Sequence, residues 1–148
     1  MTMHELLTPV LALITLTLIV WVWMYATRVP AMQKAGITPQ AARHPGTWEA
    51  QIASGARQVA ENYNHLLEQP TIFYALVFAI VLAGHTDQTH VALAWAYVAL
   101  RAVHTLIQCT VNIVMWRFSV FALSTVVLMA MAGRELCRAH LNQEQPNP

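Results

Sequence analysis

The feature that most constrains this chain is a long uncharged run near its start. The run is "LLTPVLALITLTLIVWVWMYA", from Leu6 to Ala26. Its length matches the ~20 apolar residues that a helix needs to cross a bilayer. A soluble helical protein would show one-sided apolar stripes instead. Three further apolar stretches follow, at Thr71–Gly84, Val91 to about Met115, and Phe118–Gly133. The sequence therefore predicts an all-α integral membrane protein, a bundle of four transmembrane helices.

Composition agrees with a membrane environment. Of the 148 residues, 57% are hydrophobic and only 10% are charged, against roughly 25% charged in soluble domains. The length suits one domain. The first run lacks the basic start and small-residue cleavage site of a signal peptide, so we expect it to be a retained span. We expect one membrane domain with a loop over 27–56, and spans at about 6–26, 66–84, 91–112 and 118–136.

The distribution of charge predicts an orientation. The formal net charge is only +1, which gives no indication of nucleic-acid binding. The first connection carries several basic residues and the third carries Arg117, whereas the second, "HTDQTH", has no Lys or Arg. The positive-inside rule places the first and third connections in the cytoplasm and both termini outside it. Cys109 and Cys137 form no spaced motif, so neither suggests zinc or a disulfide framework.

A polar cluster, "ENYNHLLEQP", precedes the second apolar stretch. We expect a helix to begin near Trp48, with Thr47 as its cap, and to run through this cluster and past Pro70. On that helix, side chains spaced by three or four residues share a face. They are Arg57, Glu61, Asn64 or His65, and Glu68.

A second polar stripe lies in the third apolar stretch. Its members are Arg101, His104, Gln108 and Asn112. An ionised group at the bilayer centre costs at least ~2.5 kcal/mol, so neither stripe can face lipid cheaply. We expect the two stripes to face each other or a wet cavity, with Arg101 or Arg117 opposite Glu68 or Glu61.

A purely structural interpretation competes with a functional one. Intramembrane polar residues often hold helices together through hydrogen bonds worth ~0.6 kcal/mol each. Arg57 and Glu61 can form a simple i,i+4 ion pair. The aromatic residues Trp21, Trp23, Tyr25 and Trp116 are best interpreted as interfacial anchors. As a set, however, the two stripes favour a functional pocket.

The segments that carry both stripes resemble a known family. "ENYNHLLEQPTIFYALVFAIVLAG", followed by "WAYVALRAVHTLIQCTVNIVMWRF", is similar to the prokaryotic, microsomal-glutathione-transferase-like branch of the MAPEG family. These are the membrane-associated proteins in eicosanoid and glutathione metabolism. The resemblance spans about residues 55 to 130. It implies a homotrimer in a membrane, here the bacterial inner membrane, with active sites between subunits.

The resemblance also implies residue roles. Arg117 matches the Arg that stabilises the glutathione thiolate, and Glu68 matches the Glu that takes the glutathione amine. His65, Asn64, Asn62, Arg57, Arg101, His104 and Gln108 would complete the glutathione site. A guanidinium beside a sulfur raises the fraction of reactive thiolate. Lipophilic substrates would arrive from the lipid.

Three departures from the family pattern limit the transfer of the reaction. His65 stands where the enzymes have an Asn, although Asn62 and Asn64 flank it. Glu61 replaces an expected Arg, which reverses a charge, and Gln108 replaces a Tyr. Transferring the fold is therefore safer than transferring the chemistry.

Three functional hypotheses follow. The first is a glutathione-dependent transferase or peroxidase for lipophilic electrophiles. The second is a non-catalytic lipid-binding or accessory membrane protein, which the lost Tyr and Arg favour. The third is a proton or ion channel with Glu61, His65, Glu68, His104 and Arg101 as its relay. One short protomer with one polar seam disfavours a channel.

Overall fold

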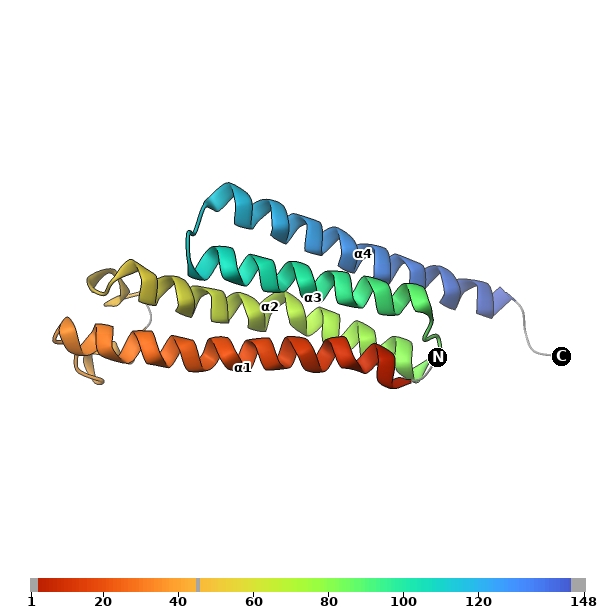
Figure 1. Ribbon diagram of the computed structural model, residues 1–148. Helices are drawn as coiled ribbons and strands as arrows, with labels where there is room; N and C mark the ends of the chain where they lie inside the picture. Colours follow the sequence, from red (N-terminus) through yellow and green to blue (C-terminus); the bar gives the residue numbers. More distant parts are fainter. Residues whose placement is uncertain (1–2, 45, 145–148) are drawn as a thin grey trace.

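The fold is a bundle of four long helices joined by three connections. The computed structural model describes residues 3–44 and 46–144. The helices are α1 (Met3–Lys34), α2 (Ser54–Leu82), α3 (Gln88–Cys109) and α4 (Val114–Glu144). They alternate in direction, and the first and third connections lie at the same end of the bundle (Figure 1). Four spans that alternate in direction necessarily place these two connections on one side.

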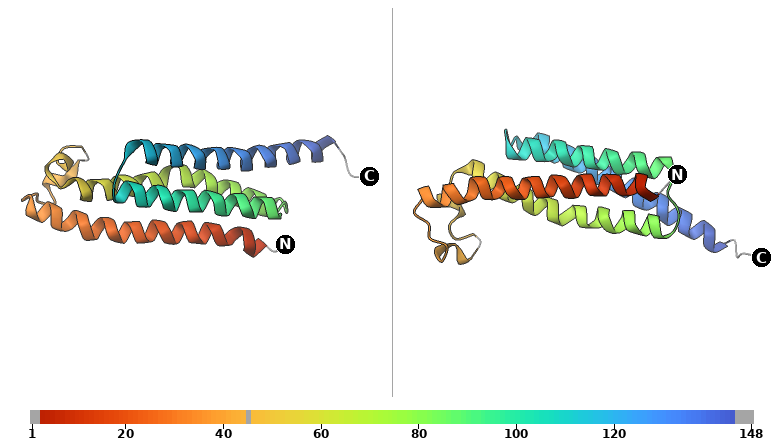
Figure 2. Two further views of the ribbon diagram at one scale, coloured as in Figure 1. Left: turned by 45° about the horizontal axis from the view of Figure 1, so that its top comes forward. Right: turned by 60° about the horizontal axis from the view of Figure 1, so that its bottom comes forward.

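The described part of the chain has four helices long and apolar enough to span a membrane. α1, α2 and α4 are longer than the spans predicted for them, because polar residues at the helix ends continue the same hydrogen-bonded ladder. α3 instead ends at Cys109, before the end of the span predicted over 91–112. α1 runs on to Lys34, so part of the predicted loop over 27–56 is helical. Where the membrane boundaries cross these helices stays a prediction. The C-terminal end of α4 projects beyond the other three helices (Figure 2).

α2 begins later than predicted. Its first residue is Ser54, not Trp48 or a neighbour, and the Thr47 hydroxyl donates to the His44 carbonyl instead of capping a helix. Trp48 is buried against the end of α1, and the Glu49 carboxylate accepts from the amides of Gly46 and Trp48. These contacts close residues 49–51 into a separate 3₁₀ turn, η2 (Glu49–Gln51).

The packing differs from that of a soluble protein both inside and outside the bundle. The core contains apolar residues such as Phe73 and Tyr97, whose rings stack with centroids 4.6 Å apart. The core also holds charged and polar side chains, whereas large apolar residues such as Leu82 (87% exposed) cover the outside. The fully or nearly fully buried polar set is Asn62, His90, Arg101, His104, Thr105, Gln108 and Ser124. Such a distribution suits a lipid solvent, because apolar surface outside costs nothing there.

The connection between α2 and α3 is set by local chemistry. Gly84 follows the end of α2 with a φ of 72°, a left-handed conformation that glycine adopts without strain. Asp87 then begins α3 by accepting a hydrogen bond from the His90 amide at 2.9 Å. An acidic N-cap satisfies one of the amides that a helix start leaves free.

Candidate functional site

One cleft brings together residues from both predicted polar stripes. It has a volume of about 190 Å³ and is lined by His65 from α2, His104 from α3 and Arg117 from α4, together with Val114, Phe118 and Phe121. The two imidazole rings meet edge to face, with centroids 6.2 Å apart. The cleft therefore combines one guanidinium and two imidazoles with an apolar wall.

His104 is fixed from two sides. Its Nδ1 lies 3.0 Å from the Arg117 carbonyl oxygen, and its Nε2 lies 3.0 Å from Gln108 Oε1. The first contact ties α3 to the first turn of α4. The ring thus positions the backbone that carries Arg117.

Arg117 is half-buried and has a neutral partner. Its guanidinium donates to Asn112 Oδ1 at 2.9 Å. Contrary to the prediction, Asn112 does not belong to the helical stripe, because α3 ends at Cys109. Instead Asn112 adopts a left-handed conformation, with a φ of 48°, in the connection before α4. Asn tolerates that conformation better than most residues, which explains why the helix stops short of it.

Arg101 lies behind the cleft and is completely buried. Its guanidinium donates to the His65 carbonyl at 2.9 Å and lies 5.5 Å from the centre of the Phe121 ring. Among the described residues, its Nε and second terminal nitrogen have no hydrogen-bond partner. Arg101 therefore links α3 to α2 and α4 and places a positive charge where the two polar stripes meet.

The predicted ion pairs between helices do not form. Within the described ranges, neither Arg101 nor Arg117 lies within 4.0 Å of Glu68 or Glu61, because both carboxylates point outward from α2. Glu68 pairs instead with His65 of the same helix at 3.2 Å. The i,i+4 pair of Arg57 and Glu61 does form, at 3.8 Å.

Two of the predicted site residues are internal. Asn62 is fully buried and donates to the Thr105 hydroxyl at 3.3 Å, and Gln108 is fully buried beneath His104. Asn62 joins α2 to α3, and Gln108 supports the His104 ring. Neither lines the cleft that holds Arg117.

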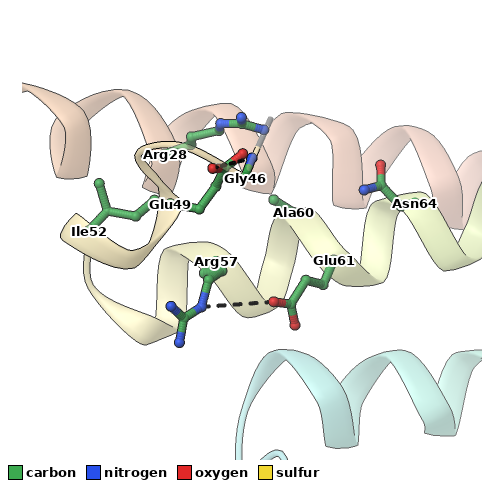
Figure 3. A pocket seen from close by; sticks show the side chains of 8 residues that line it. All are labelled: Arg28, Gly46, Glu49, Ile52, Arg57, Ala60, Glu61 and Asn64. Carbon is green, nitrogen blue, oxygen red and sulfur yellow. Dashed lines mark hydrogen bonds and ion pairs between the residues drawn. The ribbon is translucent and has the colours of Figure 1, made fainter. Parts of the chain in front are cut away.

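Arg57 and Asn64 line a different cleft. It has a volume of about 420 Å³ and lies between α1, the loop before α2, and the start of α2 (Figure 3). Arg28 and Glu49 also line it. The single predicted stripe on α2 is therefore divided between two sites.

Sequence reasoning missed two features. Phe121, which contacts both Arg101 and His104, looked like one more apolar residue of a membrane span. A second polar cluster lies at the other end of the bundle, where Arg134 and Arg138 of α4 both bind the Asp87 carboxylate. Glu135 there lies 2.6 Å from His85. The acidic residue in "HTDQTH" was the available signal for this cluster.

The charge on Asp87 follows from these partners. Burial raises the pKa of its carboxyl. The hydrogen bonds from Arg134 and from the His90 amide outweigh that effect and hold the pKa well below its usual range. The residues that the structure describes include no group of three His, Cys, Asp or Glu side chains arranged to hold a metal ion.

Comparison with known proteins supplies the family. The model of the MAPEG family matches residues 6–137. No curated protein and no solved structure matches the chain. The family match covers nearly the whole of the four-helix bundle and both polar stripes. This chain therefore belongs to the MAPEG family, the membrane-associated proteins in eicosanoid and glutathione metabolism.

Proposed function

We propose that the protein is a glutathione-dependent membrane transferase or peroxidase of the prokaryotic, microsomal-glutathione-transferase-like branch, acting on lipophilic electrophiles. One observation carries this proposal. Three helices direct His65, His104 and Arg117 at a single cleft whose other wall is apolar. An anionic thiolate and a lipophilic substrate need that combination of surfaces side by side.

Arg117 is the residue proposed to act on the thiol. A guanidinium close to a sulfur stabilises the thiolate, which is the nucleophilic form. Because its partner Asn112 is neutral, Arg117 keeps its full positive charge for a ligand. His65 and Glu68, paired on the outer face of α2, would hold the glutathione amine and peptide groups.

Two reactions fit such a site. In conjugation, the thiolate sulfur bonds to an electrophilic carbon, and the leaving group departs with the electron pair of the broken bond. In peroxide reduction, two glutathione molecules supply two electrons and two protons. The O–O bond then breaks to give an alcohol and water, and the two sulfurs form a disulfide.

The proposed assembly is a homotrimer in the bacterial inner membrane, with the first and third connections in the cytoplasm. Support comes from the outer face of α2, where the Glu68 side chain is 66% exposed and the His65 side chain 42% exposed. An ionised carboxylate facing lipid costs at least ~2.5 kcal/mol. A second copy covering this face would remove that cost.

A second function is favoured by a specific observation. Gln108, which stands in place of a Tyr in the family's enzymes, is fully buried and does not line the cleft, so it does not reach a ligand there. Glu61, in place of an Arg, pairs with Arg57. Both point to a non-catalytic lipid-binding or accessory protein with the same fold.

Calorimetric titration of the lipid-embedded protein with glutathione tests the proposal. We expect saturable binding near one ligand per subunit, weakened about tenfold or more in Arg117→Ala, since a charge-assisted contact is lost. Arg43→Ala, in the exposed loop, is the matched control and should bind normally. Absence of binding at millimolar glutathione would favour the accessory function.

A further inference from the structure

The larger cleft, which we call the α1–α2 cleft, is lined by charges of both signs. Arg28 comes from α1, Glu49 from the loop, and Arg57 and Glu61 from α2. In Figure 3, Arg28 lies beside Glu49, and Arg57 is joined to Glu61 along α2. The cleft therefore offers two guanidiniums and two carboxylates to one ligand.

The four charged groups are only weakly paired with one another, which leaves hydrogen-bonding capacity for a ligand. The Arg57–Glu61 contact is long, at 3.8 Å, and both side chains are more than two-fifths exposed. Arg28 lies over the Trp48 ring, 4.6 Å from its centroid, and no ion pair within 4.0 Å joins it to a described carboxylate. Burial raises the pKa of the Glu49 carboxyl. Hydrogen bonds from backbone amides and the charge of Arg28 lower it by more, so the net pKa is below its ordinary value and Glu49 is ionised.

An apolar groove lies further along the same two helices. Its first part, about 280 Å³, is lined by Trp21, Leu18 and Thr17 of α1 and by Tyr63 and Leu67 of α2. Its second part, about 210 Å³, shares Thr17, Leu18 and Leu67 and continues to Ile14 and Tyr74. α1 and α2 are antiparallel, so Trp21 to Ile14 on α1 and Tyr63 to Tyr74 on α2 follow the same direction, away from the charged end.

The position along α1 fits the depth of a lipid. Trp21 and Tyr25, which are 44% and 50% exposed, mark the interfacial layer where exposed aromatic rings gather. Arg28 lies three residues beyond Tyr25, about 4.5 Å further along the axis and so among the headgroups. Ile14 lies about 21 Å from Arg28 in the opposite direction, well inside the hydrocarbon layer.

We propose that the α1–α2 cleft and its groove bind one glycerophospholipid with a phosphoethanolamine head. The phosphate lies between Arg28 and Arg57, the ammonium between Glu49 and Glu61, and one acyl chain along the groove past Leu18 and Leu67. Guanidiniums bind phosphate oxygens through charge-assisted hydrogen bonds. A primary ammonium has three donors for carboxylates, whereas a trimethylated head has none. The proposal is independent of the proposed transferase activity.

Native mass spectrometry of the detergent-purified, delipidated protein tests this site. The protein is titrated with phosphatidylethanolamine, phosphatidylcholine and phosphatidylglycerol of identical acyl chains. We expect phosphatidylethanolamine to bind about tenfold more tightly than either other lipid, the effect of one charge-assisted contact. Equal retention of the three lipids would overturn the proposal.

Variants test the contacts of the lipid headgroup and of the acyl chain separately. The double variant Arg28→Gln with Arg57→Gln should weaken phosphatidylethanolamine binding about tenfold or more, while Arg43→Gln should leave it unchanged. Leu18→Trp fills the groove and should also weaken binding, whereas Leu11→Trp, on an equally exposed part of α1 (62% against 58%), should not. Wild-type affinity in both test variants would overturn the site.

Two further measurements fix the nature of the ligand. Glycerophosphoethanolamine, which has the head but no acyl chain, should compete only weakly, and full competition would overturn the role of the groove. Arg117→Ala should bind phosphatidylethanolamine like the wild type. Loss of lipid binding in Arg117→Ala would assign the lipid to the other cleft and overturn the proposal.

Discussion

Arg117 donates a hydrogen bond to a neutral acceptor, Asn112 Oδ1, at 2.9 Å. A neutral partner orients the guanidinium and leaves its charge uncompensated. A carboxylate in the same place would orient the guanidinium equally well and cancel much of its field, because opposite charges at this separation interact strongly outside bulk water. Substitution at residue 112 therefore distinguishes orientation from charge.

The first prediction concerns Asn112→Asp and Asn112→Gly. Asn112→Asp retains the acceptor but should lower the thiolate fraction of bound glutathione about tenfold, since it neutralises Arg117. Asn112→Gly suits the left-handed φ of 48° and removes only the acceptor. It should weaken glutathione binding with little loss of stability. Thiolate ultraviolet absorbance of the complex measures the first effect and calorimetry the second. An unchanged thiolate fraction in Asn112→Asp would show that Arg117 does not activate the thiol.

At the scale of elements, Asp87 fastens α4 to the connection between α2 and α3. Its carboxylate accepts from Arg134 at 2.7 Å and also from Arg138, which in turn donates to the His85 carbonyl at 3.0 Å. The same carboxylate caps α3. Asp87 thus connects α4, the start of α3 and the connection that follows α2. These contacts lie at the end of the bundle opposite the candidate site.

The second prediction is that Asp87→Asn lowers the free energy of unfolding in detergent by about 1–3 kcal/mol at neutral pH, between the values for surface and buried pairs. Asn can still cap α3, so the loss belongs to the charge. Because the folded pKa of Asp87 is depressed, its contribution is present above the unfolded pKa of about 4 and is lost as the pH falls below it.

Thermal unfolding across the acidic range measures this effect. The wild type and Asp87→Asn should therefore converge in stability on acidification. Glu68→Gln, outside this cluster, serves as the control. Parallel pH curves for the wild type and Asp87→Asn would contradict the assigned role.

The elements also show what the sequence could predict. Four spans and their alternation follow from apolar runs and charge, since hydropathy alone decides which segments cross lipid. The α2 start and the α3 end were mispredicted, because each depends on a contact distant in sequence or a local backbone choice. Trp48 packs on the end of α1, and Asn112 adopts a left-handed conformation.

The candidate site was predictable in part. Helical spacing correctly put His104 and Gln108 on the same face of α3. Spacing could not decide which of two adjacent residues, Asn64 or His65, faces α3, because they lie about 100° apart on the helix. The direction of Glu68, outward and not toward Arg101, depends on how α2 is rotated in the bundle, which only packing fixes.

At the scale of the whole molecule, large apolar side chains cover much of the outer surface, but one face of α2 exposes two carboxylates. Exposed residues such as Leu82, Leu106 and Met129 suit lipid, whereas Glu61 and Glu68 expose about half or more of their side chains. A lone protomer would therefore present carboxylates to the membrane. Either this face meets another copy or its carboxylates face the lipid.

Glu68→Leu separates these two arrangements, because they predict opposite effects. If a second copy covers Glu68, Leu removes a polar contact from the interface, and light scattering should show the assembly falling from trimer to monomer. If Glu68 faces lipid, Leu removes a cost of at least ~2.5 kcal/mol, and the protein should become more stable with its mass unchanged. We expect the first result, together with an intact trimer in the near-isosteric Glu68→Gln, which keeps hydrogen-bonding capacity. A stabilised Glu68→Leu of unchanged mass would mean that Glu68 lies outside the subunit contact and that trimerisation, if it occurs, uses a different face.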